Sequence, residues 1–558
     1  MMKEEDLDSL MIKSYPPGIK RHIQIPEIGI YQQFCRSASK YASHVAIDFM
    51  GNRISYSRLK QEIESAASFL KGLNLHKGDK LTIMLPNIPQ YVIFFFASMK
   101  LGISVVQMNP MYMLPEIEYE LNDSGSRNIV VMHDMLSKVL PLKEKMLDNI
   151  IDVRVEDYLP PVKALLYKAV KKGKSEKLAA PAGIIPYSGK SRNPAADDES
   201  IDPYNDAALL QYTGGTTGVP KAATLTHRNL LANVNQLIEW FPEDFKESIS
   251  YLSSIPFFHV YGMMTAMLTP LMQGSTIIPV PDPRDLKMTL NIIKKKKPTA
   301  FPGIPTMYHS IINYPDLEKY DISNIKLCIS GAMPLPLELQ KKFEGKTGGT
   351  LVEGYGLSEC SPVTNISPLL PEWKNRRKPG SIGLPLPETY EKIVDIDDGI
   401  TEVPQGVEGE LLIKGPQVMK GYWNRPEENK QILVDGWLHT GDIAKMDSEG
   451  YFYIVDRKKD MIIAGGYNIY PEEVEKVLYE HPGVSQCAVV GVPDAHRGET
   501  VKAIIVLSDK SVTEDEIKKY CQEKLAKYKV PKIIQFTDSL PLTPVGKIDK
   551  KALRHDKN

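Results

Sequence analysis

A glycine- and threonine-rich segment that ends in a lysine carries the clearest chemical signal in the sequence. It runs from Thr213 to Lys221 and reads Thr-Gly-Gly-Thr-Thr-Gly-Val-Pro-Lys. Glycine has no Cβ, so backbone N–H groups can approach an anion closely, and threonine hydroxyls add further donors. The segment therefore predicts a polyphosphate-binding loop, and an ordinary connecting hairpin is the alternative left open at this point. The candidate phosphate-binding residues are Thr213, Gly214, Gly215, Thr216, Thr217, Gly218 and Lys221.

The residues around the lysine distinguish this loop from the nucleotide-triphosphatase loop. That loop ends in Gly-Lys-Ser/Thr, and its last hydroxyl binds magnesium. Here Pro220 precedes Lys221, and Ala222 follows it. The sequence therefore predicts a phosphate loop of another kind.

Three later stretches carry side chains that could serve a nucleotide. Tyr355 and Glu359 lie four residues apart, where a ring can stack on a base and a carboxylate can hold magnesium. Asp442 follows a glycine and could accept hydrogen bonds from ribose hydroxyls. Lys547 ends a stiff Pro- and Gly-containing segment near the C-terminus. Taken singly, these residues also fit a strand-to-loop turn, a loop carboxylate and a solvated lysine.

The composition limits the class of protein. The 558 residues exceed one ordinary domain, and 68 basic side chains nearly balance 69 acidic ones, so we expect no nucleic-acid partner. The five cysteines are widely spaced, without a zinc or disulfide pattern. The polar start of the chain does not resemble a secretory signal, and the apolar run 91–99 is too short to span a membrane. These features predict a cytoplasmic protein in which residues 91–99 form a buried helix.

The hydrophobic pattern predicts an α/β fold. Helical spacing occurs over 55–73 and 229–240, and short apolar strands are expected at 80–85, 128–132, 207–212, 276–280 and 326–330. Alternating strands and helices favour parallel βαβ units, whose ligand loops project from the carboxyl ends of the strands. From Gly406 the texture becomes β-rich, with strands expected at 409–414 and 450–456.

A domain boundary is expected near Asp456, where the charged run 456–460 contains no apolar residue. The segment beyond it has its own pattern, with helices expected at 471–479 and 514–525 and strands at 486–492 and 501–507. The whole chain is thus predicted to form a large N-terminal body with βαβ sheets and a β-rich subdomain, and a small α+β C-terminal domain.

Between residues 160 and 205 the periodic pattern weakens, and we expect a surface loop. Its first part, residues 163–177, is rich in lysine. Two interpretations remain open, an ordinary solvated face and a peripheral contact with an anionic membrane surface at the inner face of the membrane.

Taken together in this order, the stretches resemble the adenylate-forming superfamily, which includes acyl-CoA synthetases, the adenylation domains of peptide synthetases and firefly luciferase. The resemblance covers nearly the whole chain and rests on residues 212–221, 355–359, 439–442, 456–460 with 465–468, and 546–547. Residues 85–91, 107–112, 389–391 and 465–473 are similar to those of long-chain fatty acid CoA ligases.

The resemblance implies an ATP-dependent ligase with Mg²⁺ and CoA, which joins a fatty acid to AMP and then transfers the acyl group to a thiol. It implies an AMP-binding domain at 1–455, a hinge at 456–459 and a mobile domain at 460–558. Lys221, Glu359, Lys547 and His259 would act in catalysis, and Glu359 with Thr213 would hold the metal. The resemblance assigns Gly331, Ala332, Tyr355 and Gly356 to adenine, Asp442 and Arg457 to ribose, Lys459 to the hinge, and Gly465 and Gly466 to the entry of CoA.

Other functions remain open from the sequence. The acid could be an aryl or short-chain acid, or the acceptor a carrier protein. A catalytically silent homologue that binds nucleotide or lipid is a third hypothesis, against which the intact Lys221, Glu359, Asp442, Arg457 and Lys547 argue. A buried, satisfied histidine is as acceptable for His259 as a catalytic one. Chain-length preference and a homodimeric state are not decided by these motifs.

Overall fold

The computed structural model describes residues 4–172, 183–189, 196–213, 219–246, 248–369, 371–464, 467–494, 497–543 and 548–555. The chain divides into two compact units. The larger unit contains residues 4–390 and 414–436, and the smaller one contains residues 1–3, 391–413 and 437–558. The predicted α/β class, with a large N-terminal body and a smaller C-terminal part, is confirmed. The hinge at 456–459 stays a prediction.

The largest sheet of the larger unit holds the strand that leads into the phosphate loop. Its strands pair in the order β18-β9-β8-β4-β3-β5-β6-β7. From β8 to β7 every pairing is parallel, whereas β9 is antiparallel to both β8 and β18. The strands are β3 (Lys80–Met84), β4 (Ser104–Gln107), β5 (Asn128–Met132), β6 (Asn149–Val153), β7 (Ile184–Pro186), β8 (Ala207–Thr213), β9 (Lys221–Thr226) and β18 (Gly421–Tyr422).

Two further sheets complete the larger unit. One has the order β10-β11-β1-β2, and the other has the order β12-β13-β14-β15. Their strands are β1 (Val45–Phe49), β2 (Asn52–Ser55), β10 (Ser250–Ser253), β11 (Thr276–Pro279), β12 (Leu327–Ser330), β13 (Thr350–Gly356), β14 (Val363–Ile366) and β15 (Leu384–Pro385).

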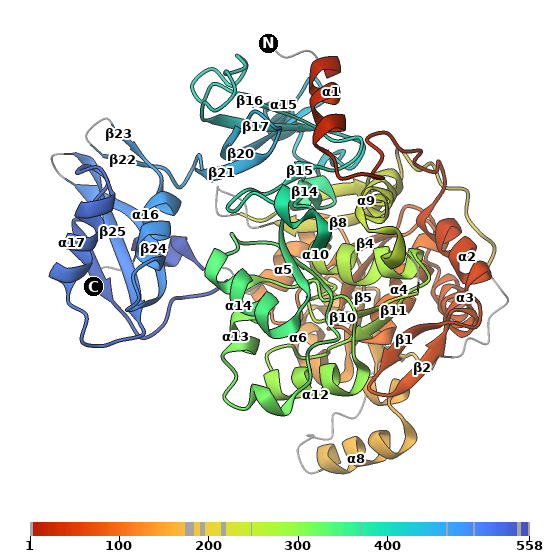
Figure 1. The fold of residues 1–558 in the computed structure, drawn as a ribbon. Coiled ribbons are helices and arrows are strands. Elements are labelled where there is room, and N and C mark those ends of the chain that lie inside the picture. Colours follow the sequence, from red (N-terminus) through yellow and green to blue (C-terminus); the bar gives the residue numbers. More distant parts are fainter. Residues whose placement is uncertain are drawn as a thin grey trace. The chain divides into compact units, whose positions relative to one another are not determined.

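Helices surround these sheets (Figure 1). They are α1 (Glu4–Ser14), α2 (Ile30–Lys40), α3 (Tyr56–Gly72), α4 (Pro89–Lys100), α5 (Leu114–Ser124), α6 (Leu136–Val139), α7 (Lys143–Met146), α8 (Pro161–Lys172), α9 (His227–Trp240), α10 (Val260–Met263), α11 (Thr269–Met272), α12 (Leu286–Lys296), α13 (Pro305–Ile312), α14 (Leu337–Thr347) and α15 (Pro426–Ile432).

Helix α4 confirms the buried helix predicted for the run 91–99. All of its residues are buried, and it packs against α2 and α3 at one side of the larger unit (Figure 1). A helix that is apolar on every face has no side that gains from contact with water, so it is stable only inside a core. Lys100, its last residue, keeps its charge paired with Asp198.

The segment from 160 to 205 differs from the expected surface loop. Residues Pro161–Lys172 form helix α8, and Ile184–Pro186 add strand β7 to the sheet edge. Val162, Leu165 and Leu166 of α8 are exposed and not part of a core, so they formed no inward-facing stripe that would mark the helix in the sequence. Residues 173–182 and 190–195 lie outside the described residues.

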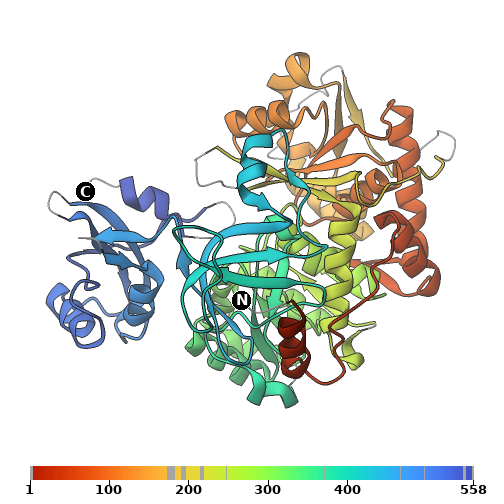
Figure 2. The ribbon, with the colours of Figure 1, turned by 90° about the horizontal axis from the view of Figure 1, so that it is seen from above.

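Two sheets lie wholly or largely in the smaller unit. One is a five-stranded sheet of β16 (Tyr390–Val394), β17 (Gly409–Lys414), β19 (Leu433–Val434), β20 (Trp437–Met446) and β21 (Phe452–Arg457). The C-terminal sheet, drawn in blue in Figure 1 and Figure 2, consists of β22 (Ile462–Ala464), β23 (Tyr467–Ile469), β24 (Val484–Asp494), β25 (Gly498–Leu507) and β26 (Ile533–Phe536). Its helices are α16 (Pro471–Tyr479), α17 (Glu514–Lys524) and α18 (Lys550–His555).

Strand β24 explains why helices cover both faces of the C-terminal sheet. Successive side chains of a strand point to opposite faces. Cys487 and Val489 join the hydrophobic core beneath α16 and α17, whereas Ala488 and Val490 pack with Leu553 of α18. Both sets are apolar, so each face requires its own cover.

Candidate functional site

The phosphate loop connects two antiparallel strands. Thr213 ends β8 and Lys221 begins β9, and the two residues face each other in the strand pair. The Thr213 hydroxyl donates to the backbone carbonyl of Lys221 over 3.3 Å. Gly214, Gly215, Thr216, Thr217 and Gly218 lie outside the described residues.

This arrangement corrects the expectation that the loop belongs to a parallel βαβ unit. The chain turns back after β8 and forms β9 before helix α9 begins. Residues 221–226 pair with β8 along their length, so the segment after the loop is a strand of the same sheet. The loop still lies at the carboxyl end of β8, as predicted.

Lys221 meets an acidic and an aromatic side chain in the larger unit. Its ammonium lies 3.6 Å from a carboxylate oxygen of Glu428 and 5.7 Å from the centre of the Tyr422 ring. The lysine side chain is 16% exposed, so it is partly desolvated but open to a ligand. A nearby ring and carboxylate stabilise the ammonium in a defined place.

Tyr422 also contacts Glu359. The tyrosine hydroxyl donates to Glu359 Oε1 over 2.6 Å. Burial, and then the neighbouring Glu359 carboxylate, raise the pKa of Tyr422 well above its ordinary value. The phenol therefore stays protonated at neutral pH and acts as a donor. Lys221, Tyr422 and Glu359 thus form one contact chain, which we call the Lys221–Tyr422–Glu359 cluster.

The backbone around Tyr422 is fixed on both sides. Strand β18 pairs with β9, placing Tyr422 opposite Ala223. The Asn429 side chain accepts from the Tyr422 N–H over 2.7 Å and donates to its carbonyl over 2.9 Å. In addition, the Met419 N–H donates to the Glu359 carbonyl over 2.7 Å. These bonds hold the strand between β9 and the turn that carries Glu359.

Tyr422, Glu428 and Asn429 were missed by the sequence analysis. Tyr422 lies 63 residues from Glu359 and belongs to a two-residue strand. A strand that short has no alternating pattern, so only the sheet pairing reveals its place. The only local indication of this strand was the Gly421-Tyr422 pair that follows the apolar strand 409–414.

The residues assigned to adenine occupy neighbouring strand ends. Strands β12 and β13 are parallel, and Ser330 faces Glu353 in the pair. Gly331 and Ala332 follow β12, and Tyr355 with Gly356 closes β13, so these residues lie at one edge of the sheet. Ala332 has a positive φ of 69°, a conformation unusual for a residue with a side chain.

At two of these positions a side chain larger than that of glycine would clash with neighbouring atoms. A Cβ at Gly356 would lie 1.9 Å from the Pro362 carbonyl oxygen, which is a direct clash with backbone. A Cβ at Gly331 would lie 2.8 Å from the Tyr261 ring. That ring is itself held, because its hydroxyl donates to the Gly303 and Ile329 carbonyls over 3.1 and 2.9 Å.

His259 lies close to the strand that leads into the phosphate loop. It caps helix α10, and its Nδ1 accepts from the Tyr261 N–H over 3.3 Å. The next residue, Val260, donates its N–H to the side chain of Gln211 in β8 over 2.8 Å. The half-buried imidazole is therefore positioned near the end of β8. The capping bond occupies one ring nitrogen, Nδ1. It is compatible both with a catalytic histidine and with a buried, structural one.

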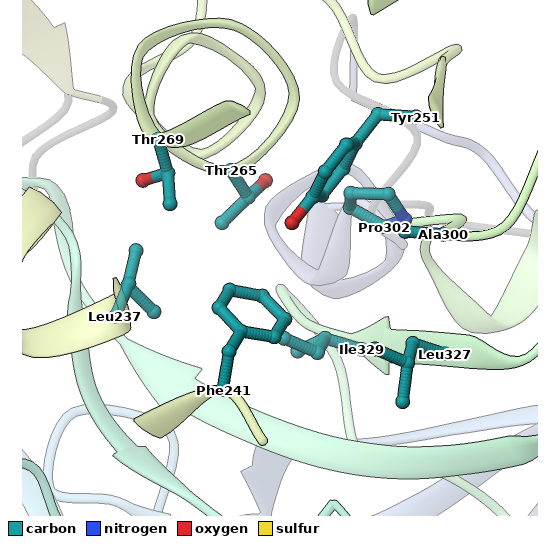
Figure 3. Close-up of a pocket in the computed structure, with 9 residues that line it drawn as sticks. All are labelled: Leu237, Phe241, Tyr251, Thr265, Thr269, Ala300, Pro302, Leu327 and Ile329. Carbon is teal, nitrogen blue, oxygen red and sulfur yellow. The ribbon is translucent and has the colours of Figure 1, made fainter. Parts of the chain in front are cut away.

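A narrow apolar pocket lies beside these elements in the larger unit (Figure 3). One wall is β12, which ends just before Gly331, and another is the helical segment that begins after His259. The cavity volume is only about 10 Å³, which leaves room for about one water molecule. Its lining residues are Leu237, Phe241, Tyr251, Thr265, Thr269, Ala300, Pro302, Leu327 and Ile329.

The smaller unit brings the two predicted ribose-binding residues together. Asp442 of β20 faces Arg457 of β21, and Arg457 Nε lies 3.2 Å from Asp442 Oδ1. The carboxylate is 7% exposed and the guanidinium 50% exposed, so the arginine reaches solvent while the aspartate is held beneath it.

The predicted hinge residues contact their own unit. Asp456 accepts from the N–H of Glu472, at the start of α16, over 2.8 Å. Lys458 lies 3.0 Å from Glu410 of β17, while Lys459 is exposed. Gly465, Gly466 and Lys547 lie outside the described residues.

Comparisons with known proteins agree with the motifs. Residues 34–423 match the AMP-binding enzyme family, and residues 473–547 match the AMP-binding enzyme C-terminal domain. The chain is 43% identical over 550 residues to the long-chain-fatty-acid–CoA ligase of Bacillus subtilis, covering 97% of both chains. It is 36% identical over 514 residues to the feruloyl-CoA synthase of an Amycolatopsis species, covering 91% of this chain and 95% of that one.

Solved structures give the same result. The crystal structure of ATP-bound MatB from Rhodopseudomonas palustris has a TM-score of 0.80 at 28% identity and covers 94% of this chain and 98% of its own. The similarity spans both the larger N-terminal body and the C-terminal part. This chain belongs to the AMP-binding enzyme family.

Proposed function

We propose that this enzyme is an ATP-dependent long-chain fatty acid CoA ligase. It would form acyl-adenylate and pyrophosphate, then acyl-CoA and AMP. The observation that carries the adenylation step is the Lys221–Tyr422–Glu359 cluster beside the ends of the phosphate loop. The Bacillus subtilis relative, similar over nearly its whole length, supports the choice of a fatty acid.

In the first half-reaction a carboxylate attacks an anionic phosphorus, so positive charge must converge on the transferring group. Lys221 would meet the departing pyrophosphate, and its pairing with Glu428 keeps the ammonium near the loop until phosphate replaces that carboxylate. Lys547 would bridge the acid and the α-phosphate. Tyr355, Gly356, Gly331 and Ala332 would enclose the adenine, and Asp442 with Arg457 would bind the ribose.

The residues around Glu359 fit a magnesium ion. Among the described residues there is no group of three or more His, Cys, Asp or Glu side chains that could enclose a metal. Mg²⁺ in nucleotide enzymes is instead held by one or two carboxylates together with phosphate and water oxygens. Glu359 Oε1 accepts from Tyr422, and Oε2 has no hydrogen-bond partner within the described ranges, so it can serve as that ligand. Thr213, at the end of β8, would supply a hydroxyl to the same ion. When bound, the ion would neutralise charge on the leaving pyrophosphate.

The second half-reaction requires the bulky, anionic CoA to reach the adenylate. We propose that residues 456–459 form the hinge of this step, with the domain at 460–558 rotating after adenylation. Gly465 and Gly466 would line the CoA entry, because glycines permit close passage of the thiol arm. A cytoplasmic location is supported by the five cysteines, all free thiols.

The test is pyrophosphate exchange and CoA-dependent AMP release with a panel of acids. We expect palmitate and oleate to be preferred over acetate and benzoates. The second candidate is an aryl acid ligase, favoured by the similarity to a feruloyl-CoA synthase. Strict preference for aryl acids would exclude the fatty acid proposal, and absence of AMP with every acid would favour a silent nucleotide-binding homologue.

Tyr422→Phe is expected to lower kcat/KM for ATP at least about tenfold, because a hydrogen bond to a charged group contributes about 1.5–3 kcal/mol. The phenylalanine keeps the ring beside Lys221 and removes only the hydroxyl bound to Glu359. Tyr158→Phe is the matched control, since its hydroxyl also donates to a glutamate, Glu62, over 2.6 Å. Equal activities of the two variants would contradict the role of Tyr422.

Gly331→Ala is expected to raise KM for ATP and to lower the melting temperature. The added methyl would lie 2.8 Å from the Tyr261 ring, and overpacking of this kind costs about 1–3 kcal/mol. Gly345→Ala in α14 is the control, because nothing lies within 4 Å of its Cβ. We expect that control to stabilise the protein by about 0.5–1 kcal/mol. A Gly331→Ala protein with normal KM and melting temperature would exclude the tight contact.

A further inference from the structure

Helix α8 displays apolar side chains to solvent. It projects from the edge of the larger unit (Figure 1). Val162, Leu165 and Leu166 are 72%, 71% and 60% exposed. Residues three and four apart share one helix face, so these side chains form a single outward stripe. Isolated exposed apolar residues are ordinary, but a stripe concentrated on one projecting helix marks an interaction surface.

Lysines flank the stripe on both sides. With about 100° of rotation per residue, Lys163 lies on one side of Val162 and Lys168 on the other, and both are exposed. The sequence from 161 to 177 contains six lysines, Lys163, Lys168, Lys171, Lys172, Lys174 and Lys177, against one acidic residue, Glu176. The helix itself, Pro161–Lys172, contains four of these lysines and no acidic residue, so it combines an apolar stripe with net positive charge.

The opposite face of α8 holds it to the body of the protein. Tyr167 is half-buried, and its hydroxyl donates to Asp134 over 3.4 Å. Lys163 donates to the Met50 carbonyl over 2.6 Å. The acidic groups near the helix, Asp134, Glu156 and Asp157, lie on neighbouring segments that face Tyr167 and Lys168. These contacts hold the Tyr167 face of the helix against the protein, so the apolar stripe on the other face points to solvent.

We propose that α8 is a docking helix for an anionic lipid surface, with Val162, Leu165 and Leu166 inserted among the acyl chains and Lys168 at the headgroups. An apolar stripe bordered by lysine is the pattern of helices that lie in the plane of a membrane interface. The charge selects a lipid surface carrying negative charge over a second copy of this equally basic helix, which would repel it. In the part of the chain that the structure describes, no helix combines the length and the apolar character that a membrane span requires.

The experiment is sedimentation of the full-length protein with vesicles of pure phosphatidylcholine and of phosphatidylcholine with 30% phosphatidylglycerol. We expect binding to the anionic vesicles, weaker binding to the neutral ones, and loss of binding at high salt, because salt screens the lysine charges. Leu165→Ser with Leu166→Ser is expected to weaken vesicle binding at least tenfold. Ile400→Ser, at a residue that is 74% exposed in the smaller unit, is the control and should bind as the unchanged protein does.

A second measurement reports insertion directly. Leu166→Trp should show a blue-shifted emission when anionic vesicles are added, because the indole moves from water into the interface. Failure of the unchanged protein to bind anionic vesicles, or equal binding by the double serine variant, would overturn the proposal. A double serine variant that changes a dimer into a monomer in light scattering, with vesicle binding unaffected, would assign α8 to self-association instead. All variants should keep normal acyl-adenylate formation with a soluble acid, since α8 carries none of the residues assigned to that step.

Discussion

Lys547→Ala is expected to lower the rate of acyl-adenylate formation by about 10²–10³-fold, the usual cost of losing one preorganised charge or donor at the reacting group. The lysine would bridge the acid and the α-phosphate only while these two groups react. Conversion of a supplied acyl-adenylate to acyl-CoA should therefore remain largely intact. ATP–pyrophosphate exchange measures the first step, and thioester formation from synthetic palmitoyl-adenylate and CoA measures the second.

The control for this experiment is Lys551→Ala, which removes an exposed lysine from helix α18. That variant should perform both steps normally. If Lys547→Ala slowed both half-reactions equally, the lysine would be needed for the fold or for a shared site, and its assignment to adenylation would be wrong.

Glu359→Gln is expected to lower acyl-adenylate formation by about 10²-fold or more, since it removes the negative charge that would hold the metal of the transferring phosphoryl group. The substitution keeps the shape of the side chain, and its amide oxygen can still accept from Tyr422, which lies 2.6 Å away in the native protein. The packing should thus be preserved while the charge is lost. The loss should be accompanied by a higher Mg²⁺ concentration at half-maximal activity, measured by pyrophosphate exchange.

Glu338→Gln provides the matched control, because Glu338 is an exposed carboxylate whose pair with Lys341 lies at the surface. Exposed pairs contribute little to stability, so this variant should behave as the unchanged protein. A Glu359→Gln enzyme with an unchanged Mg²⁺ requirement would remove Glu359 from the metal site, whatever its rate.

Much of the fold was predictable because burial imposes a period on the sequence. The apolar residues of 55–73 recur at helical spacing, and helix α3 occupies Tyr56–Gly72. The short apolar run at 128–132 became β5, Asn128–Met132, in the interior of the sheet. The helical spacing of the first segment predicts a helix, and the short apolar run of the second predicts a buried strand.

Elements without a buried face were not predictable in this way. Helix α8 has its apolar residues in solvent, and the two-residue strand β18 is too short for any period. Strand β9 was not among the expected strands, and its antiparallel pairing with β8 is visible only in the tertiary structure.

The sequence by itself determined the fold class and the chemical types at the candidate site: a glycine-rich loop with Lys221, a carboxylate at Glu359 of the kind that suits magnesium, and an acid at Asp442. These follow from local composition, since anion and metal binding require particular side chains whatever surrounds them. Only the tertiary structure decided which groups meet. Tyr422 joins Lys221 to Glu359 because β18 pairs with β9, and Asp442 faces Arg457 because β20 pairs with β21. Such contacts depend on strand register between distant segments, which local sequence does not specify.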